Sequence, residues 1–455
     1  MRISGIVGLM KKRNYTAAVG FYALGCPKNI VDSEKMLAQI AEAGFLICSD
    51  PGEADVVVVN TCGFIEPAKQ EALETIRHAV ELKKEGRVKR VVVAGCLSQR
   101  MGKDLFNHVV GIDAVVGLAE RDNIGQVIKD VLESEETHFY MSRAESSVDD
   151  TQRLLITPGH WAYLRISEGC DHKCSFCTIP AIRGKFRSKP MDSILKEAAE
   201  LVSAGAVELN VIAQDTAYYG KDIGLQNGLA RLLKELEKVK GLEWIRLMYV
   251  YPTGITDKLV ETIAESEKIL PYIDMPIQHV NDGILKMMGR PDTKKRISAV
   301  MDKLRMAMPD IVLRTTVIVG FPGETDEQFD ELVDFIEDNR FDALGCFTYF
   351  AEEGTAAAEF KGQIADNMKK ARQEKLMTAQ QQIAFEKNRN RIGKELICLV
   401  DSIKGKNRIG RFYGQAPEID SICIIKKCKA KPGEFVKTKV IDFNGYDLAV
   451  EQVKH

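Results

Sequence analysis

This sequence has no long apolar run, little net charge and no recognisable export signal. No run approaches the roughly 18 consecutive apolar residues that a membrane-spanning helix requires. The formal net charge is −2 over 455 residues, so no global basic field attracts nucleic acid or an anionic membrane. Contact with nucleic acid must therefore come from a local patch, and we expect no contact with a membrane.

The N-terminus does not have the order of a signal peptide, because its apolar stretch is short and its basic cluster follows that stretch. We hold as a hypothesis that translation starts at Met10, with Met1 as the alternative. The eleven cysteines are an odd number, which argues against a disulfide framework and for metal or redox chemistry. We therefore expect a cytoplasmic protein.

The chain length predicts about three domains. Residues 15–135 alternate Val-rich runs with helical stretches, which predicts a doubly wound α/β domain with parallel strands buried on both faces. Residues 155–385 repeat a strand and a helix about six times, as in a full or partial TIM-like β/α barrel. A long polar helix is expected over 362–391. The short alternating strands of residues 390–455 then predict a small OB-like β-barrel.

The stretch "SEGCDHKCSFC" spaces Cys170, Cys174 and Cys177 as C-x3-C-x2-C, directly after a predicted barrel strand. Thiolates favour zinc or the iron of iron–sulfur clusters, and structural zinc needs four closed ligands. His172 lies between two of the cysteines, where reaching the same metal would strain the loop. A 4Fe–4S cluster with one open iron fits better, and zinc or purely structural cysteines are the alternatives.

With Phe176 before its last cysteine, this motif resembles the signature of the radical S-adenosylmethionine superfamily. The resemblance implies that the amino and carboxylate groups of S-adenosylmethionine chelate the open iron, and that one electron then yields a 5′-deoxyadenosyl radical. The stretch "VIVGFPGET" resembles the superfamily's cofactor-supporting strand and loop. Phe176, Gly320 and Pro322 are therefore candidate cofactor-binding residues, with a plain barrel corner as the alternative for the glycine and proline.

Four polar residues elsewhere in the predicted barrel are further candidates for a functional role, and three of them allow a second interpretation. Gln278 and His279 are expected at a strand end, where His279 is either a functional or a structural histidine. Arg183 and Arg187 follow the cysteine motif and suit bidentate binding of a carboxylate of substrate or cofactor. The alternative for both arginines is a solvated loop.

A second trio, Cys26, Cys62 and Cys96, follows three predicted parallel strands of the first domain. Such strands end at one edge of a sheet, where α/β sheets bind ligands, so we expect the thiols to converge, with adjacent glycines letting the loops approach. This predicts a second three-cysteine cluster whose open iron holds a sulfur ligand. The alternative is three buried cysteines that act as small hydrophobes. The remaining cysteines lack ligand spacing and are expected to be structural: Cys48, Cys346, Cys398, Cys423 and Cys428.

The domain order and the two cysteine trios resemble the radical methylthiotransferase family over nearly the whole chain. The stretches "GCPKNIVDSE", "NTCGFIEPAKQEA", "QDTAYYG" and "YVYP" resemble the branch that modifies one aspartate of ribosomal protein S-12. The resemblance implies two 4Fe–4S clusters, S-adenosylmethionine as radical source and methyl donor, and sulfide or polysulfide as sulfur source. The implied product is 3-methylthioaspartate, and the implied C-terminal domain is a TRAM barrel. No catalytic residue is identified beyond the cluster cysteines.

The resemblance also implies partners: ribosomal protein S-12 as substrate, a flavodoxin or ferredoxin as electron donor, and contact with the small ribosomal subunit. Four lysines of the C-terminal domain are close together in sequence: Lys426, Lys427, Lys429 and Lys431. They are either a contact for RNA or a solvated face.

Two other functions stay open at this point. One is methylthiolation of an adenosine in tRNA, against which the Pro27–Lys28 pair argues, since that branch typically has G-C-Q-M-N at the first cysteine. The other is an iron–sulfur RNA-binding protein, against which the two cysteine trios argue.

Overall fold

The computed structural model describes residues 17–142 and 149–453, so the hypothesis about Met10 falls outside the described residues. The chain forms two compact units, and each is described by itself. The first comprises Met1–Ile156, Glu168–Asp171 and Cys177–Lys189, and the second comprises Thr157–Ser167, His172–Phe176 and Pro190–His455.

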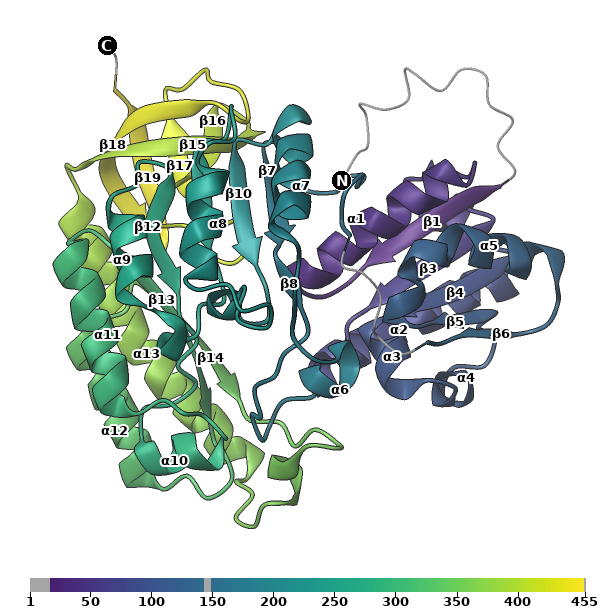
Figure 1. The fold of residues 1–455 in the computed structure, drawn as a ribbon, viewed down its shortest axis with the longest axis horizontal. Helices are drawn as coiled ribbons and strands as arrows, with labels where there is room; N and C mark the ends of the chain where they lie inside the picture. Colours follow the sequence, from purple (N-terminus) through teal and green to yellow (C-terminus); the bar gives the residue numbers. More distant parts are fainter. Residues whose placement is uncertain (1–16, 143–148, 454–455) are drawn as a thin grey trace. The chain divides into compact units, whose positions relative to one another are not determined.

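The first unit is built on a six-stranded parallel sheet with the strand order β2-β1-β3-β4-β5-β6 (Figure 1). Its strands are β1 (Ala18–Ala23), β2 (Leu46–Cys48), β3 (Val56–Thr61), β4 (Arg90–Gly95), β5 (Ala114–Val116) and β6 (His138–Tyr140). The short apolar runs predict β1, β3 and β4 correctly, and those of β3 and β4 are rich in valine. The other three strands have three residues each, too few for a periodic pattern, and β6 extends the sheet beyond residue 135.

Both faces of this sheet are apolar, because successive side chains of a strand point to opposite sides, and each face packs in a core of its own. Val57, Val59 and Val91 pack in one core with residues of α2 (Glu66–Lys84). Their neighbours Val56 and Val58 pack in another core with residues of α1 (Pro27–Glu42) and α5 (Ile124–Glu133). The predicted doubly wound α/β architecture is confirmed. Two short helices follow β4, namely α3 (Cys96–Met101) and α4 (Asp104–His108).

The second unit contains a six-stranded parallel sheet with the order β14-β13-β12-β11-β10-β7. The strands are β7 (Trp161–Arg165), β10 (Glu208–Ile212), β11 (Trp244–Leu247), β12 (Ile269–Asp274), β13 (Val312–Val319) and β14 (Ala343–Thr348). Helices α7 (Met191–Ser203), α8 (Gly228–Leu236), α9 (Asp257–Ala264), α10 (Asp282–Met287), α11 (Lys294–Ala307) and α12 (Asp326–Asn339) lie between them in sequence. The sheet is open, so the partial form of the predicted β/α barrel is the one present. The short elements β8 (Ser167–Glu168), α6 (Ile179–Arg183) and β9 (Arg187–Ser188) follow β7.

The helix α13 (Asp366–Arg391) agrees with the predicted polar helix, and a closed five-stranded barrel follows it. The barrel strands are β15 (Glu395–Lys404), β16 (Asn407–Phe412), β17 (Cys423–Lys426), β18 (Phe435–Asn444) and β19 (Asp447–Gln452). The predicted small β-barrel is confirmed. Cys398, Cys423 and Cys428 are buried in its core, which agrees with their structural interpretation.

A buried charge network joins this small barrel to the parallel sheet of the same unit. Glu208 on β10 accepts a hydrogen bond from Arg246 Nε at 2.9 Å and pairs at 2.7 Å with Arg411 Nη1 of β16. Arg411 also binds Asp401 of β15 through two contacts of 2.8 Å, and Asp401 contacts His160 Nε2 at 2.8 Å. The sequence does not show which of these residues pair, because the partners are far apart in the chain.

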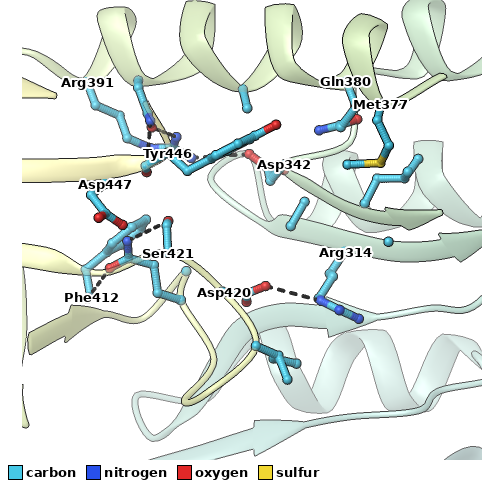
Figure 2. A pocket seen from close by; sticks show the side chains of 18 residues that line it. Arg314, Asp342, Met377, Gln380, Arg391, Phe412, Asp420, Ser421, Tyr446 and Asp447 are labelled. Carbon is cyan, nitrogen blue, oxygen red and sulfur yellow. Dashed lines mark hydrogen bonds and ion pairs between the residues drawn. The ribbon is translucent and has the colours of Figure 1, made fainter. Parts of the chain in front are cut away.

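The loop between β16 and β17 makes a second connection. Asp420 accepts hydrogen bonds from Tyr272 Oη at 2.8 Å and from Arg314 Nε at 3.2 Å, the latter drawn in Figure 2. Beside this contact lies a cavity of about 430 Å³, with Tyr446 extending across it. Within the residues that the structure describes, no helix is both long and apolar enough to cross a membrane.

Replacing Glu208 by Gln removes the one carboxylate between two buried guanidinium groups. Breaking a buried ion pair from one side costs about 3 kcal/mol or more, so we expect faster native-state hydrogen exchange in β10, β11 and β16. The matched control is Glu243→Gln, at an exposed position directly before β11. It should change the free energy of unfolding by no more than about 0.5 kcal/mol. Unchanged exchange protection in Glu208→Gln would contradict the role assigned to this network.

Candidate metal centre

Cys26, Cys62 and Cys96 lie at the carboxyl ends of three neighbouring strands of the first unit. Cys26 precedes α1 after β1, Cys62 follows β3, and Cys96 begins α3 directly after β4. β1 pairs with β3 and β3 with β4, all in parallel. The direction of chain winding reverses between β1 and β3, which is the position where doubly wound sheets bind ligands.

Two glycines show how closely the three loops approach. Gly25 has a φ of +93°, and a Cβ atom there would lie 2.7 Å from Cys62 Cβ and 3.2 Å from its sulfur. A Cβ atom at Gly63 would lie 2.7 Å from Leu97 Cα and 3.2 Å from the carbonyl carbon of Cys96. Because real Cβ atoms do not tolerate 2.7 Å contacts, both positions require glycine. The loops therefore touch one another, as the sequence predicts.

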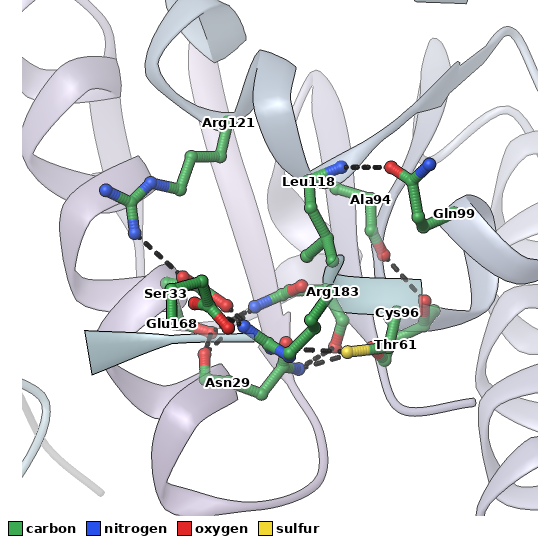
Figure 3. Close-up of polar contacts among 12 residues, drawn as sticks. Asn29, Ser33, Thr61, Ala94, Cys96, Gln99, Leu118, Arg121, Glu168 and Arg183 are labelled. Carbon is green, nitrogen blue, oxygen red and sulfur yellow. Dashed lines mark hydrogen bonds and ion pairs between the residues drawn. The ribbon is translucent and has the colours of Figure 1, made fainter. Parts of the chain in front are cut away.

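Hydrogen bonds between buried polar side chains of α1 and β3 hold these loops in place. Asn60, after Val59 on β3, donates to Ser33 Oγ at 2.7 Å and to the carbonyl of Asn29 at 3.1 Å. Asn29 in turn donates to the carbonyls of Leu24 at 2.5 Å and Thr61 at 3.3 Å. This network, shown in part in Figure 3, ties the loop of Cys26 to the loop of Cys62.

Arg183 is buried against the third cysteine, with 2% of its surface exposed. Its Nη2 donates to Cys96 Sγ at 3.2 Å and to Asp32 Oδ2 at 2.9 Å, and its Nη1 donates to Glu168 Oε2 at 2.9 Å. Figure 3 shows the guanidinium pointing toward these partners. The interpretation of Arg183 as a solvated loop residue is therefore wrong, whereas Arg187 is half-buried.

The rest of the "VDSE" segment is also used within the first unit. Asp32 accepts a second charge-assisted bond from Arg121 Nη1 at 2.8 Å. Glu34 lies 3.3 Å from Arg153 Nη1 and accepts from the backbone N–H of Ile156 at 3.1 Å. Sequence reasoning missed these roles. The available signal was the run of polar residues Asp32, Ser33 and Glu34 on α1, a helix that also carries core residues.

Burial dominates the acid–base behaviour of two of these thiols. It raises the pKa of Cys62, and it raises the pKa of Cys96 to about 12, although the Arg183 charge acts in the opposite direction. Cys26 is exposed. A metal that bound these two thiols would therefore have to displace their protons.

Among the described residues, no three or more His, Cys, Asp or Glu side chains have the spacing of a site for a single metal ion. In an iron–sulfur cluster each thiolate binds a different iron, so its ligands stand farther apart than the ligands of one ion. Three soft thiols that converge without a fourth protein ligand fit such a cluster.

Two cysteines of the C-x3-C-x2-C motif belong to the first unit. The backbone N–H of Cys170 donates to the carbonyl of Gly184 at 3.1 Å, and Cys177 Sγ accepts from the N–H of Ile179 at 3.5 Å. These bonds fix the loop on both sides of the motif. Hydrogen bonds to sulfur also tune a cluster that the thiolate holds.

Cys174 belongs to the second unit, where Tyr251 Oη lies 3.8 Å from its sulfur. The ring of His172 stacks on Tyr251 at 4.1 Å, and His172 Nε2 contacts Asp215 Oδ2 at 2.7 Å. Arg290 covers the Tyr251 ring at 3.6 Å. His172 is thus held by a carboxylate and an aromatic ring, which disfavours the zinc alternative.

The predicted cofactor-supporting residues all belong to the second unit, where they lie in or beside one apolar core cluster. Phe176 packs against a core cluster that includes Phe321. Gly320 and Phe321 donate their backbone N–H groups to Glu324 Oε2 at 2.8 Å and 3.1 Å. Pro322 is buried beside them. This loop is therefore fixed by its own carboxylate, and its cofactor role stays a prediction.

Gln278 and His279 differ in what they offer. His279 is fully buried, and its Nδ1 accepts from the N–H of Asn281 at 3.0 Å. Burial lowers the pKa of His279 to about 3, so the ring is neutral. Among the described residues its Nε2 is buried without a hydrogen-bond partner, so the functional and the structural interpretation both stay predictions. Within the described residues, Gln278 Oε1 and both amide atoms of Asn210 on β10 are buried without a hydrogen-bond partner.

The two remaining cysteines belong to neither trio. Cys346 is buried on β14, and Cys48 is half-buried and donates to the carbonyl of Asp50 at 3.1 Å. Neither finding contradicts a structural role.

Three family models match the chain in succession. The Uncharacterized protein family UPF0004 matches residues 18–117, the Radical SAM superfamily matches residues 164–336, and the TRAM domain matches residues 392–453. The radical superfamily and the TRAM domain are those expected from the sequence.

Solved structures of low sequence identity share the fold. The radical S-adenosylmethionine methyltransferase TsrM from Kitasatospora setae is 14% identical with a TM-score of 0.54, and 73% of this chain aligns with 74% of that chain. The cobalamin-dependent radical enzyme OxsB is 14% identical with a TM-score of 0.51, over 81% of this chain and 56% of the other.

Curated relatives match from end to end and carry the name ribosomal protein uS12 methylthiotransferase RimO. The relative from Thermoanaerobacter sp. (strain X514) is 44% identical over 95% of this chain and 99% of its own length. The relative from Geobacter sulfurreducens is 42% identical over 96% of this chain and 99% of its own. With this identity over essentially the whole of both chains, the protein belongs to the RimO family of radical S-adenosylmethionine methylthiotransferases.

Proposed function

We propose that this chain replaces one β-carbon hydrogen of an aspartate in ribosomal protein S-12 by a methylthio group, giving 3-methylthioaspartate. The observation that carries the proposal is the end-to-end similarity to relatives named for this activity, at 44% identity in the first of them. The two cysteine trios support it, because sulfur insertion at an unactivated C–H bond requires both a radical and a sulfur donor.

Cys170, Cys174 and Cys177 are proposed to hold a 4Fe–4S cluster, with S-adenosylmethionine on its open iron. Bound there, the two cofactors would supply a radical that abstracts hydrogen from an unactivated carbon. The protein's part is to orient them. Phe176, Gly320 and Pro322 shape the cofactor's surroundings, and the buried unpartnered Gln278 Oε1 offers a hydrogen-bond acceptor.

Cys26, Cys62 and Cys96 are proposed to hold a second 4Fe–4S cluster. Its open iron would bind sulfide or polysulfide, and a second S-adenosylmethionine would provide the methyl group. The convergence of three loops at one sheet edge supports this site, because Gly25 and Gly63 leave no room for side chains between them. Burial excludes water from two of the thiols, which protects a bound sulfur species from side reactions.

The remaining parts of the proposal concern partners. A flavodoxin or ferredoxin is the expected electron donor, and the C-terminal barrel is the expected contact with the small ribosomal subunit. The substrate places the reaction in the cytoplasm. The ion pairs of Glu208 and Asp420 fix the small barrel to the parallel sheet within the second unit, so a substrate bound by one would be oriented relative to the other.

Deletion of the gene should remove a mass of about 46 Da from one aspartate of ribosomal protein S-12, since a hydrogen replaces methylthio. Mass spectrometry of S-12 from parent and deletion cells measures this directly, and complementation with the intact gene is the control. An unchanged S-12 together with loss of methylthioadenosine from tRNA would transfer the activity to the tRNA-modifying class.

The two cysteine trios should separate the two half-reactions. Cys96→Ala should lower the iron content from about eight to about four atoms per chain, keep reductive cleavage of S-adenosylmethionine, and abolish methylthiolation. Cys174→Ala should abolish both reactions. Iron analysis and chromatography of 5′-deoxyadenosine and modified S-12 peptide measure these outcomes.

The matched control is Cys346→Ala, a buried cysteine outside both trios, which should retain iron and both activities. Methylthiolated product from Cys96→Ala would contradict the second cluster. Cleavage of S-adenosylmethionine by Cys174→Ala would contradict the first.

A further inference from the structure

Arg183 donates a hydrogen bond to Cys96, one of the proposed ligands of the second cluster, at an Nη2–Sγ distance of 3.2 Å. We propose that Arg183 is a positioning residue that raises the reduction potential of the cluster on Cys26, Cys62 and Cys96. The inference rests on the proposed function, because it requires that cluster. It assigns a role to a side chain outside both cysteine trios.

The first argument is the location of the charge. Arg183 is 2% exposed and Cys96 is 5% exposed, so water and salt screen their interaction weakly. A guanidinium is always protonated, and the charge is therefore present at every pH at which the protein is folded. Reduction adds an electron to a cluster, and a fixed positive charge with an N–H donor at a ligand sulfur stabilises the reduced form.

The second argument is the fixed direction of the guanidinium. One edge of the group is bound to Asp32 at 2.9 Å and the other to Glu168 at 2.9 Å. Asp32 is itself held by Arg121 Nη1 at 2.8 Å. A planar fork between two carboxylates has little freedom to rotate, so Nη2 stays directed at Cys96 Sγ.

The third argument is the charge that Arg183 balances. Without it, Glu168 loses this charge-assisted bond and Asp32 keeps its bond to Arg121, and both carboxylates stay buried near Cys96. Their negative charge would then oppose reduction. Removal of Arg183 thus acts twice in the same direction, by loss of a donor to Cys96 and by loss of a positive charge that offsets the two carboxylates.

The position of Arg183 in the chain adds a connection between the two motifs. Glu168 precedes Cys170 by two residues, and Arg183 ends α6, which begins two residues after Cys177. The guanidinium is carried by the chain after the radical motif, and it contacts Glu168 before that motif and Cys96 of the other trio. All of these contacts lie inside the first unit.

The test uses the full chain with Cys170, Cys174 and Cys177 replaced by Ala, so that only the N-terminal cluster can form. This parent should hold about four iron atoms and give the spectrum of a 4Fe–4S cluster. If it binds no cluster, the proposed function fails at its second site, and that result is distinct from a failure of the Arg183 inference.

In this parent, Arg183→Gln should make reduction at least tenfold less favourable, a shift of about 59 mV to more negative potential for a one-electron couple. A redox titration followed by electron paramagnetic resonance measures the midpoint. Arg183→Lys keeps the charge without the fork and should give a smaller shift in the same direction. The same midpoint in Arg183→Gln and in the parent would overturn the inference.

Two further variants control for a general structural effect. Arg121→Gln removes another buried arginine, whose Nη1 binds Asp32 and whose Nη2 binds the carbonyl of Asp149. It should change the equilibrium constant of reduction by less than tenfold. Asp32→Asn removes a negative charge while Arg183 stays, and it should shift the midpoint to more positive potential. Should Arg183→Gln fail to assemble a cluster, the sign of the Asp32→Asn shift decides, and a negative shift there contradicts the inference.

Discussion

The arrangement of the candidate metal centre depends on one buried carboxylate, Asp32. It accepts charge-assisted hydrogen bonds from Arg121 and Arg183, and both contacts are shorter than 3 Å. Burying a charge is costly unless it is paired, so each arginine is required by the carboxylate and fixed by it. Through Arg183 this pairing reaches Cys96 and Glu168. The sheet edge that carries Cys26, Cys62 and Cys96 is therefore organised by ion pairs as much as by packing of the valine-rich core.

Periodicity in the sequence was sufficient for the architecture. Short apolar runs predict β1, β3 and β4, and the position of a cysteine after each of them predicts which edge carries the thiols. The strands β2, β5 and β6 were missed, because three residues are too few to show a pattern. They form only when longer neighbours offer free edge groups for pairing, which is a tertiary effect.

Side-chain pairing was much less accessible. Arg183 was placed equally well in a solvated loop, because nothing in "AIRGK" indicates that Asp32, more than 100 residues earlier, stands opposite. His279 was left undecided, and its burial with an accepting Nδ1 is visible in the structure alone. Glu208, Arg246 and Arg411 are polar residues inside strands, and this was the available sign that they face one another. Their partners are specified by the three-dimensional arrangement.

The small C-terminal barrel is tied to the parallel sheet by matched charges, with Arg411 opposite Glu208 and Asp420 opposite Arg314. This has a consequence for chimeras between relatives. A transplanted barrel that lacks either residue would leave Glu208 or Arg314 short of a partner in the host, whatever its own stability. The exchangeable module is therefore larger than the barrel alone: it includes the strands β10, β11 and β13, whose charges face it, and domain boundaries drawn at the end of α13 would cut through it.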